Sequence, residues 1–409
     1  MKKILSITLG ILTAIGGFVD IGDLVANAAT GARFKMALAG VVLIGVLGII
    51  VYAEMSGRVA AITGRPVFDL VRERLGPNAG GANLIASFII NLLTLCAELG
   101  GVALALSMIA SVNYILLIPV AAFLVWIVIW KMPFERMEEM FGLLGLMLIT
   151  FLVALFHLHP PWHELLHSAS HPAIPKNETP FTFAYYAIAL FGAAMTPYEV
   201  FFFSSGAVEE KWTVDDLNLN RANVYIGFPL GGLLSLSIMA LTTVVFAPRM
   251  ISVDTLPQVA LPVALSVGKV GLGLLIIGIF AATFGAALET AMSSGYCVAQ
   301  YFGWQWGKFV KPREAARFHV VMLAAIVATT LFALTGVDPV KVTEYSIVLS
   351  AAALPLTYFP ILLISNDRHY MGDHVNGRVL NFLASIYMVI IAVVAVVTIP
   401  LMIITKAGA

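Results

Sequence analysis

The sequence predicts an all-α integral membrane protein with about 11 transmembrane helices, in two inverted five-helix repeats with broken helices 1 and 6. Composition is the first reason: of 409 residues, 60% are hydrophobic and only 11% are charged, whereas about a quarter of a soluble domain is charged. Apolar stretches of about twenty residues, the length that crosses a bilayer, recur throughout. The third reason is that two of these stretches contain a short polar interruption.

No linker between the apolar stretches is long enough for a soluble domain, so a single polytopic transmembrane domain is expected over residues 1–409. We expect repeat one at about 8–157, repeat two at about 182–365, and an extra helix at about 378–404. The expected spans are 8–31, 35–57, 82–110, 113–130, 137–157, 182–207, 220–247, 271–301, 315–336, 343–365 and 378–404.

The basic residues orient these spans. Most of the 23 Lys and Arg residues fall in alternate loops, beginning with Lys2 and Lys3 at the N-terminus, and positively charged loops stay on the cytoplasmic side. An odd number of spans then places the N-terminus in the cytoplasm and the C-terminus outside. We expect a multi-pass protein of a bacterial inner membrane.

The first interruption is Asp20-Ile21-Gly22-Asp23, within the first expected span. A carboxylate at the bilayer centre costs at least about 2.5 kcal/mol, and such residues usually mark a functional site. Gly22 lets a helix open, so it is the predicted helix-break residue. Unwinding here would also free backbone carbonyls as oxygen ligands.

The second interruption is Thr196-Pro197-Tyr198-Glu199, within the sixth expected span. Pro197 disrupts its own helical turn and has no N–H, so the carbonyl of Ala193 loses its helical donor. Broken helices at membrane depth persist where they line a cavity. Two of them in corresponding spans suggest a transporter site near the bilayer centre.

The acidic residues in the apolar spans have no basic partner at mid-span; they are Asp20, Asp23, Glu98, Glu199 and Glu289. A buried carboxylate without a partner takes up a proton or binds a cation. We therefore expect the counter-charge to be a transported cation. The predicted metal ligands are Asp20, Asp23, Ala193, Thr196 and Glu199. Oxygen ligands suit Mg²⁺, Ca²⁺ and Mn²⁺, and Met195 could add a soft sulfur if the unwound turn directs it inward.

Both interruptions resemble segments of the Nramp family of divalent-metal transporters. The first is similar to the family's Asp-Pro-Gly-Asn segment and the second to its Met-Pro-His segment. Glu98, in Cys-Ala-Glu-Leu-Gly-Gly, resembles the acidic motif of span 3, and further similar segments are 293–296 and 354–372. The resemblance covers essentially the whole chain and implies a LeuT-like fold.

The resemblance also implies ligands. Asp20 and Ala193 match the family's Asp and Ala, whereas Asp23 replaces an Asn and Thr196 replaces a Met. A thioether helps to reject hard ions, so its loss favours a hard ion. The pattern is most similar to the Nramp-related magnesium transporter branch, in which partly hydrated Mg²⁺ is carried without proton coupling.

Three more positions depart from the family's pattern. Tyr198 replaces a His and Leu95 replaces an acid, both of the family's proton pathway, and Ile347 stands where span 10 usually has a Gln. Glu98 and Tyr198 are the remaining candidates for an ion or proton pathway.

These observations predict a secondary transporter of divalent metal cations that works by alternating access, prefers Mg²⁺ and is not proton-coupled. One alternative is a proton-coupled Mn²⁺ or Fe²⁺ importer of the ordinary Nramp type. A second is a sodium-coupled amino-acid transporter of the same fold, although Asp20 and Asp23 would repel a substrate carboxylate.

We expect no enzymatic activity and no cofactor, the metal being the substrate. The expected partners are the metal ion and the lipid bilayer, with no nucleic acid and no obligate protein partner.

The loop 158–180 carries a competing signal. His163-Glu164-Leu165-Leu166-His167 has the H-E-x-x-H spacing of zinc metalloproteases, and Pro161 would start a helix that places both histidines on one face. A membrane zinc enzyme is therefore a third possible function, although the loop has no enclosing domain to form a cleft. His159 and His171 extend the four-residue spacing, so the segment is either an ion-attracting stripe or a polar amphipathic connector.

Overall fold

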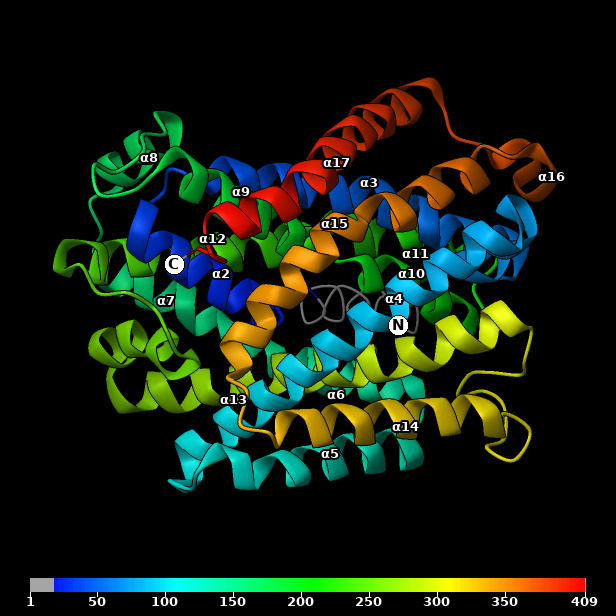
Figure 1. Cartoon of the computed structure of the whole chain (residues 1–409), viewed down its shortest axis with the longest axis horizontal. Coiled ribbons are helices and arrows are strands. Elements are labelled where there is room, and N and C mark those ends of the chain that lie inside the picture. Colours follow the sequence, from blue (N-terminus) through cyan, green and yellow to red (C-terminus); the bar gives the residue numbers. More distant parts are fainter. Residues whose placement is uncertain (1–17, 409) are drawn as a thin grey trace.

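The computed structural model describes residues 18–408, in which helices joined by loops and turns make up the fold and no strand is present (Figure 1). Ten helical segments within it are long and apolar enough to cross a membrane. The predicted fold class is confirmed, and the chain is a multi-pass membrane protein. Only the part of the first expected span from residue 18 onward lies within the described residues.

The helices before residue 180 make up most of the predicted first repeat and the loop that follows it. They are α2 (Ile21–Phe34), α3 (Ala39–Thr63), α4 (Val67–Ala110), α5 (Tyr114–Lys131), α6 (Phe134–Gly145), the short 3₁₀ turn η1 (Leu146–Ile149), α7 (Thr150–His157) and α8 (Trp162–Ser170).

The helices of the predicted second repeat and the extra helix follow. They are α9 (Pro180–Ala194), α10 (Pro197–Glu209), η2 (Val214–Asp216), α11 (Leu217–Ala222), the π-helical turn η3 (Asn223–Gly227), α12 (Phe228–Val245), η4 (Ala247–Arg249), α13 (Leu256–Phe302), α14 (Ala316–Ala333), α15 (Pro339–Ser365), α16 (Arg368–Met371), η5 (Gly372–His374) and α17 (Arg378–Ile404).

Two helices extend beyond the spans expected from hydropathy. Both α4 and α13 contain one non-helical glycine, Gly76 with φ 85° and Gly268 with φ 75°. Glycine adopts positive φ without the steric cost that other residues incur. Each glycine therefore joins a short leading helix to the apolar span, where the sequence predicted a loop.

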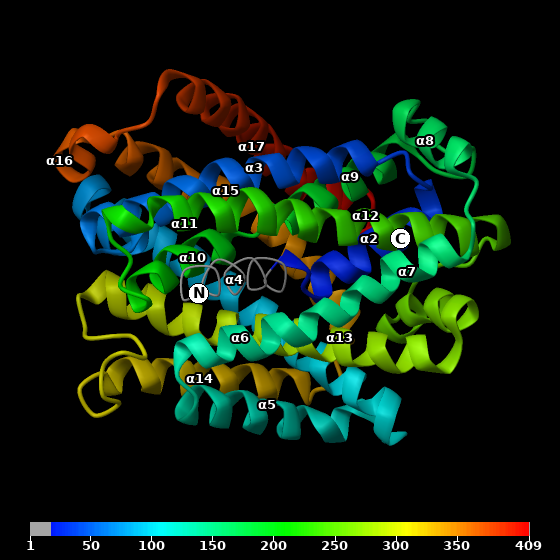
Figure 2. The ribbon, with the colours of Figure 1, turned by 180° about the vertical axis from the view of Figure 1, so that it is seen from behind.

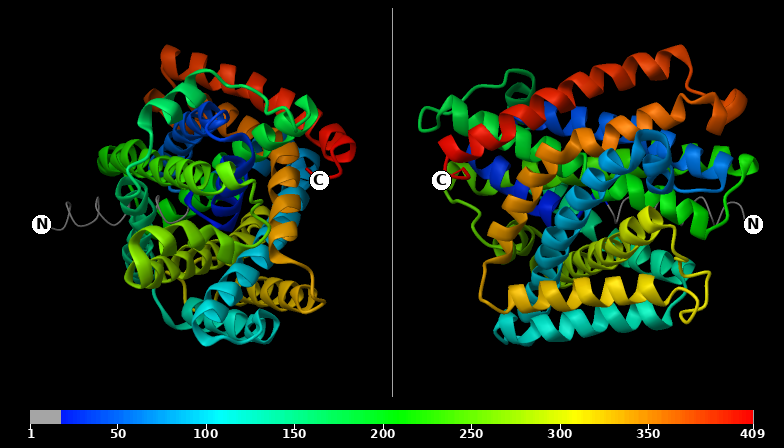
Figure 3. Two further views of the ribbon diagram at one scale, coloured as in Figure 1. Left: turned by 90° about the vertical axis from the view of Figure 1, so that its left-hand side faces the viewer. Right: turned by 45° about the vertical axis from the view of Figure 1, so that its right-hand side comes forward.

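The long helices form a layered bundle. Helices α13 and α15 pack along α4, and α17 covers α15 on one side. On the opposite side α5 and α14 lie side by side, as Figures 1 and 2 show and as the turned views of Figure 3 confirm. Helices α2 and α10 begin near the middle of the molecule rather than at one end.

Helix α2 occupies the interior of this bundle. Every one of its residues is buried except Arg33, and it contacts α9, α12, α13 and α15. A helix that is apolar and buried all round marks the centre of a large helical protein. The polar N-terminus of α2 is consequently held deep inside the molecule.

Candidate metal-binding site

At the first predicted interruption, Val19 and Asp20 are not helical, and α2 begins directly after them at Ile21. Asp20 is the N-cap of α2, with extended backbone (φ −89°, ψ −177°), and its Oδ1 accepts a hydrogen bond of 2.8 Å from the backbone N–H of Asp23. Aspartate is a favoured N-cap because it satisfies one of the free N–H groups of the first turn.

Gly22 does not form the break predicted for it, because it lies in the first turn of α2. The glycine is instead needed for close packing. A Cβ at this position would lie 3.0 Å from Oδ1 of Asp20 and 3.1 Å from Cδ1 of Ile347. The physical reason for the difference is that the Asp20 cap starts the helix before the glycine is reached.

The second break lies where the sequence places it. Helix α9 ends at Ala194 and α10 begins at Pro197, whose missing N–H is tolerated at the first helical position. The Oγ1 of Thr196 donates a 2.8 Å hydrogen bond to the carbonyl of Ala193. That carbonyl, deprived of its helical donor by Pro197, keeps a lone pair available.

The two breaks meet at a small cavity between α2, α4, α9 and α15. Its volume of about 20 Å³ is room for about one water molecule or one bare ion. All polar side chains around it present oxygen atoms. The polar lining residues are Asp20, Thr94, Glu98, Thr196, Thr343, Ser346 and Ser350.

Two carboxyl groups face this cavity. Glu98 of α4 is fully buried; its Oε1 accepts from the backbone N–H of Ile21 at 3.2 Å, and its Oε2 has no partner among the described residues. Oδ2 of Asp20 accepts a 3.2 Å hydrogen bond from the hydroxyl of Tyr198. The positive end of the α2 dipole thus lies beside both carboxyl groups. Within residues 18–408 neither makes an ion pair with Lys or Arg.

The structure separates the other two predicted acidic ligands from this cavity. Asp23 is buried against α12, where it accepts hydrogen bonds from Ser235 Oγ at 2.6 Å and Asn27 Nδ2 at 2.8 Å. Glu199, in the first turn of α10, is buried near Glu289 of α13 and does not line the cavity. Of the predicted set, Asp20, Ala193 and Thr196 line the cavity, while Asp23 and Glu199 do not.

Met195 does not supply a sulfur ligand in this arrangement. Its Sδ packs against Gly48 of α3, where an added Cβ would be 2.6 Å from it and 2.8 Å from the ring of Tyr387. No group of three or more His, Cys, Asp or Glu side chains in residues 18–408 is arranged to hold a metal. A bound ion would therefore rely on carboxylates together with carbonyl and hydroxyl oxygens.

Sequence reasoning missed the hydroxyl groups of the cavity. Thr343, Ser346 and Ser350 lie on one face of α15, and Ser346 Oγ is 2.8 Å from Thr94 Oγ1 of α4. The signal available in the sequence was the i, i+3, i+7 spacing of these hydroxyls in an otherwise apolar span. Such residues are easily taken for packing residues, because a hydroxyl can bond its own helix, as Thr343 does to Pro339 O.

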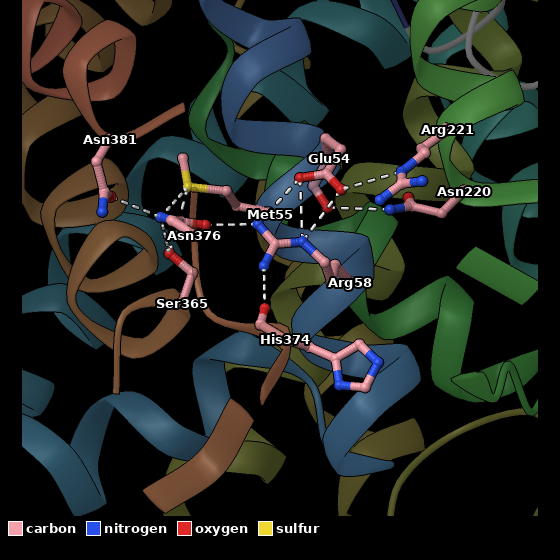
Figure 4. Close-up of polar contacts among 9 residues, drawn as sticks. All are labelled: Glu54, Met55, Arg58, Asn220, Arg221, Ser365, His374, Asn376 and Asn381. Carbon is pink, nitrogen blue, oxygen red and sulfur yellow. Dashed lines mark hydrogen bonds and ion pairs between the residues drawn. The ribbon is translucent and has the colours of Figure 1, made fainter. Parts of the chain in front are cut away.

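A second buried polar cluster, here called the Arg58 network, lies toward the C-terminal end of α3 (Figure 4). Arg58 pairs with Glu54 at 3.1 Å and also donates to Asn376 Oδ1 and to the carbonyl of His374. Asn220 of α11 donates to the carbonyl of Glu54. The network therefore joins α3 to α11 and to the segment between η5 and α17.

Residues 10–400 match the family described as Natural resistance-associated macrophage protein-like, abbreviated Nramp. The chain belongs to the Nramp family. It is 22% identical over 380 residues to the divalent metal cation transporter MntH of Aeromonas hydrophila, covering 89% of this chain and 88% of that protein. It is 24% identical to MntH of Chromohalobacter salexigens over 384 residues, covering 90% and 84%.

Solved structures share the fold of this Nramp protein. The Eremococcus coleocola manganese transporter superposes with a TM-score of 0.73 at 17% identity, over 96% of this chain and 86% of that one. Mhp1, a nucleobase-cation-symport-1 family transporter, superposes with a TM-score of 0.64 at 15% identity, over 98% and 92%. The family assignment agrees with the resemblance seen in the sequence, but it does not distinguish a magnesium branch.

Proposed function

We propose that this Nramp protein carries a divalent metal cation across the membrane, and that the ion binds in the cavity between α2, α4, α9 and α15. The observation that carries the proposal is the pair Asp20 and Glu98. Both are buried at one cavity, and neither has a basic partner within residues 18–408. A divalent cation would supply the missing positive charge.

The broken helices suit this task. The carbonyl of Ala193 and the hydroxyl of Thr196 lie at the junction of α9 and α10, opposite the N-terminus of α2. Discontinuous helices present backbone groups to an ion and allow each half to move separately. We expect alternating access to open the cavity first to one face of the membrane and then to the other.

Mn²⁺ is the first candidate for the cargo. The curated relatives are named divalent metal cation transporters MntH, and one structural neighbour is a manganese transporter. The size of the cavity points in the same direction, because it has room for about one water molecule. Mg²⁺ gives up its water reluctantly, so a small cavity favours an ion that loses its water more readily.

Mg²⁺ is the second candidate, and the donor atoms favour it. The polar side chains of the cavity are all oxygen donors, and Met195 is directed elsewhere. A site without a thioether loses one means of rejecting hard ions. For Mg²⁺ to bind with part of its hydration shell, the cavity would have to enlarge during the transport cycle.

Uptake by purified protein in liposomes tests the proposal. We expect Mn²⁺ entry that Asp20→Asn abolishes, and Mg²⁺ added in excess should compete only if it shares the site. Unchanged Mn²⁺ uptake by the folded Asp20→Asn variant would contradict the proposed site. A pH dye inside the liposomes separates proton-coupled entry, which acidifies the lumen, from the uncoupled entry suggested by the sequence.

Amino-acid transport and zinc-dependent hydrolysis have less support than metal transport. A substrate carboxylate would be repelled by Asp20 and Glu98, which argues against amino-acid transport. The H-E-x-x-H histidines lie on the exposed surface of α8, so a hydrolase would lack the enclosed cleft in which a catalytic zinc polarises its substrate.

A further inference from the structure

A groove lined mostly by apolar side chains lies between α5 and α14, on the side of the bundle away from α17 (Figures 1 and 2). Its volume is about 290 Å³, which is close to the lower limit of about 300 Å³ for pockets that hold small organic molecules. The last turns of α5 and the first turns of α14 form its walls. Among the lining residues are Trp126, Ile129, Trp130, Ala316, Val320 and Leu323.

Tryptophan residues gather at this end of the two helices. Of the six in the chain, Trp126 and Trp130 line the groove, while Trp304 and Trp306 belong to the segment 303–315 that joins α13 to α14. Tryptophan is enriched where a membrane meets water, because its ring is apolar and its N–H is polar. The mouth of the groove therefore lies at the membrane surface, and the groove continues along α14 toward the membrane interior.

Lys308 ties the segment 303–315 to the end of α5. Its Nζ donates a hydrogen bond to the carbonyl of Ile129, a residue that lines the groove. That carbonyl lacks a helical donor, because the residue four positions further on is Pro133, which has no N–H. An ammonium group has three N–H donors, so Lys308 retains donors for an anion at the mouth of the groove.

More positive charge surrounds the mouth. Four exposed basic residues are next to groove-lining residues in the chain: Lys131, Lys311, Arg313 and Arg317. Neither these four nor Lys308 makes an ion pair within residues 18–408. The guanidinium of Arg317 lies 5.2 Å from the ring centre of Trp304, and Glu314 is the single acidic residue in 303–317. An anion would supply the missing negative charge.

We propose that the groove binds an anionic phospholipid, with an acyl chain along the apolar walls and the phosphate among the basic residues at the mouth. An apolar groove that ends in unpaired positive charge is complementary to an amphipathic anion, and basic pockets between membrane helices bind lipid head groups. A zwitterionic lipid offers the same acyl chain, but its own cationic group would be repelled at the mouth.

A second copy of this chain would fit the groove less well. A twofold axis along the membrane normal brings equivalent ends of two copies together. The basic residues of the two mouths would then face each other, and like charges repel. The charge at the mouth therefore favours a lipid over a contact between two copies.

Native mass spectrometry of the full-length protein in detergent tests the proposal. Phosphatidylglycerol and phosphatidylcholine with identical acyl chains are titrated separately into the delipidated protein, and the bound molecules are counted. We expect one phosphatidylglycerol to bind at least about tenfold more tightly than phosphatidylcholine. The triple variant Lys311→Gln, Arg313→Gln, Arg317→Gln should lose this preference, because it removes three of the charges at the mouth.

The matched control for charge is Lys176→Gln, Lys269→Gln, Lys341→Gln. It removes the same number of positive charges from exposed residues that do not line the groove, and it should keep the preference for phosphatidylglycerol. Equal affinity of the natural protein for the two lipids, or an equal loss in this control, would overturn the proposal.

A second pair of variants tests the apolar walls. Ala316→Trp fills part of the groove and should weaken phosphatidylglycerol binding about tenfold or more, whereas Ala324→Trp, at an exposed position of the same helix outside the groove, should not. Unchanged binding by Ala316→Trp would contradict the site. A dimer that Ala316→Trp dissociates and that phosphatidylglycerol leaves intact would assign the groove to a second copy. Equal melting temperatures in lipid-free detergent show that the variants are folded.

Discussion

The central cavity and the Arg58 network both bury carboxylates within the membrane-spanning bundle, but they treat the charge differently. In the network, Glu54 is bound by Arg58 and both side chains are about 95% buried. In the cavity, Asp20 accepts hydrogen bonds from Tyr198 and the backbone of Asp23, and Glu98 accepts one from the backbone of Ile21. None of these donors is charged, and Glu98 Oε2 has no partner within residues 18–408.

Whether a buried carboxylate has a basic partner separates a structural role from a functional one. A buried ion pair with its hydrogen bonds satisfied is strongly destabilised when one partner is removed, because the other charge is left uncompensated. Buried carboxylates without a partner destabilise the folded protein, because the cost of removing them from water is not offset. Such residues in membrane spans usually mark a functional site. The network therefore holds helices together, whereas the unpaired carboxylates of the cavity support the cation site that we propose there.

The largest effect on transport is expected from Asp20→Asn. The amide can still cap α2, but the cavity loses a charged ligand, so Mn²⁺ uptake should fall more than the roughly 10–100-fold typical of losing a supporting residue. The melting temperature should stay constant or rise, because a buried charge is removed. Liposome uptake and thermal unfolding measure the two effects.

Asp23→Asn is the matched control for this comparison. Asp23 is equally close to the break but bonds Ser235 and Asn27 instead of lining the cavity. Its substitution should reduce uptake much less than Asp20→Asn does. Equal losses in the two variants would mean that Asp23 turns into the cavity during transport and belongs to the ligand set as the sequence predicted.

The largest effect on stability is expected from Arg58→Ala. This change leaves Glu54 buried without its partner, at a cost of about 3–5 kcal/mol, and also breaks the links to Asn376 and His374. Thermal unfolding in detergent measures the loss. Adding Glu54→Gln should recover part of it, and purely additive effects of the two changes would contradict the pairing.

A smaller effect, on selectivity, is expected from Thr196→Met. The change introduces a thioether at the junction of α9 and α10, where the cavity otherwise presents oxygen. Soft ligands favour soft ions, so uptake of Cd²⁺ relative to Mn²⁺ should rise by about threefold or more. An unchanged Cd²⁺ to Mn²⁺ ratio would indicate that residue 196 does not contact the ion.

The smallest effect is expected from Asp367→Asn, outside the membrane spans. The backbone N–H of His369, together with Arg74 at 2.6 Å, lowers the pKa of the Asp367 carboxyl below its usual value. Its stabilisation is present above the ordinary Asp pKa and is lost as the pH falls through the lowered value. Because the pair is partly exposed, the variant should lose less than about 1 kcal/mol at neutral pH, measured as a difference in melting temperature that disappears in acid.

Much of the architecture followed from local sequence. Apolar length predicted the spans, since a bilayer demands about twenty residues per helix. Pro197 predicted the second break because a missing N–H acts on its own turn, whatever the helix packs against. The helix after Pro161 was also predicted from local signals, and α8 is present. The leading helices of α4 and α13, which end at Gly76 and Gly268, were missed because each is too short to cross a bilayer, and apolar length reports only spans of about twenty residues.

The division of the acidic residues was decided by tertiary structure. No sequence pattern distinguishes Asp20 from Asp23. In the structure, however, Asp20 faces the cavity, whereas Asp23 accepts a hydrogen bond from Ser235, which lies 212 positions away in the chain. Glu98 joins the cavity only because α4 passes the N-terminus of α2. The sequence alone determined that unpaired carboxylates and broken helices lie within the membrane, because charge and backbone chemistry belong to individual residues. Helix packing, a property of the whole chain, decided which of those carboxylates share a cavity.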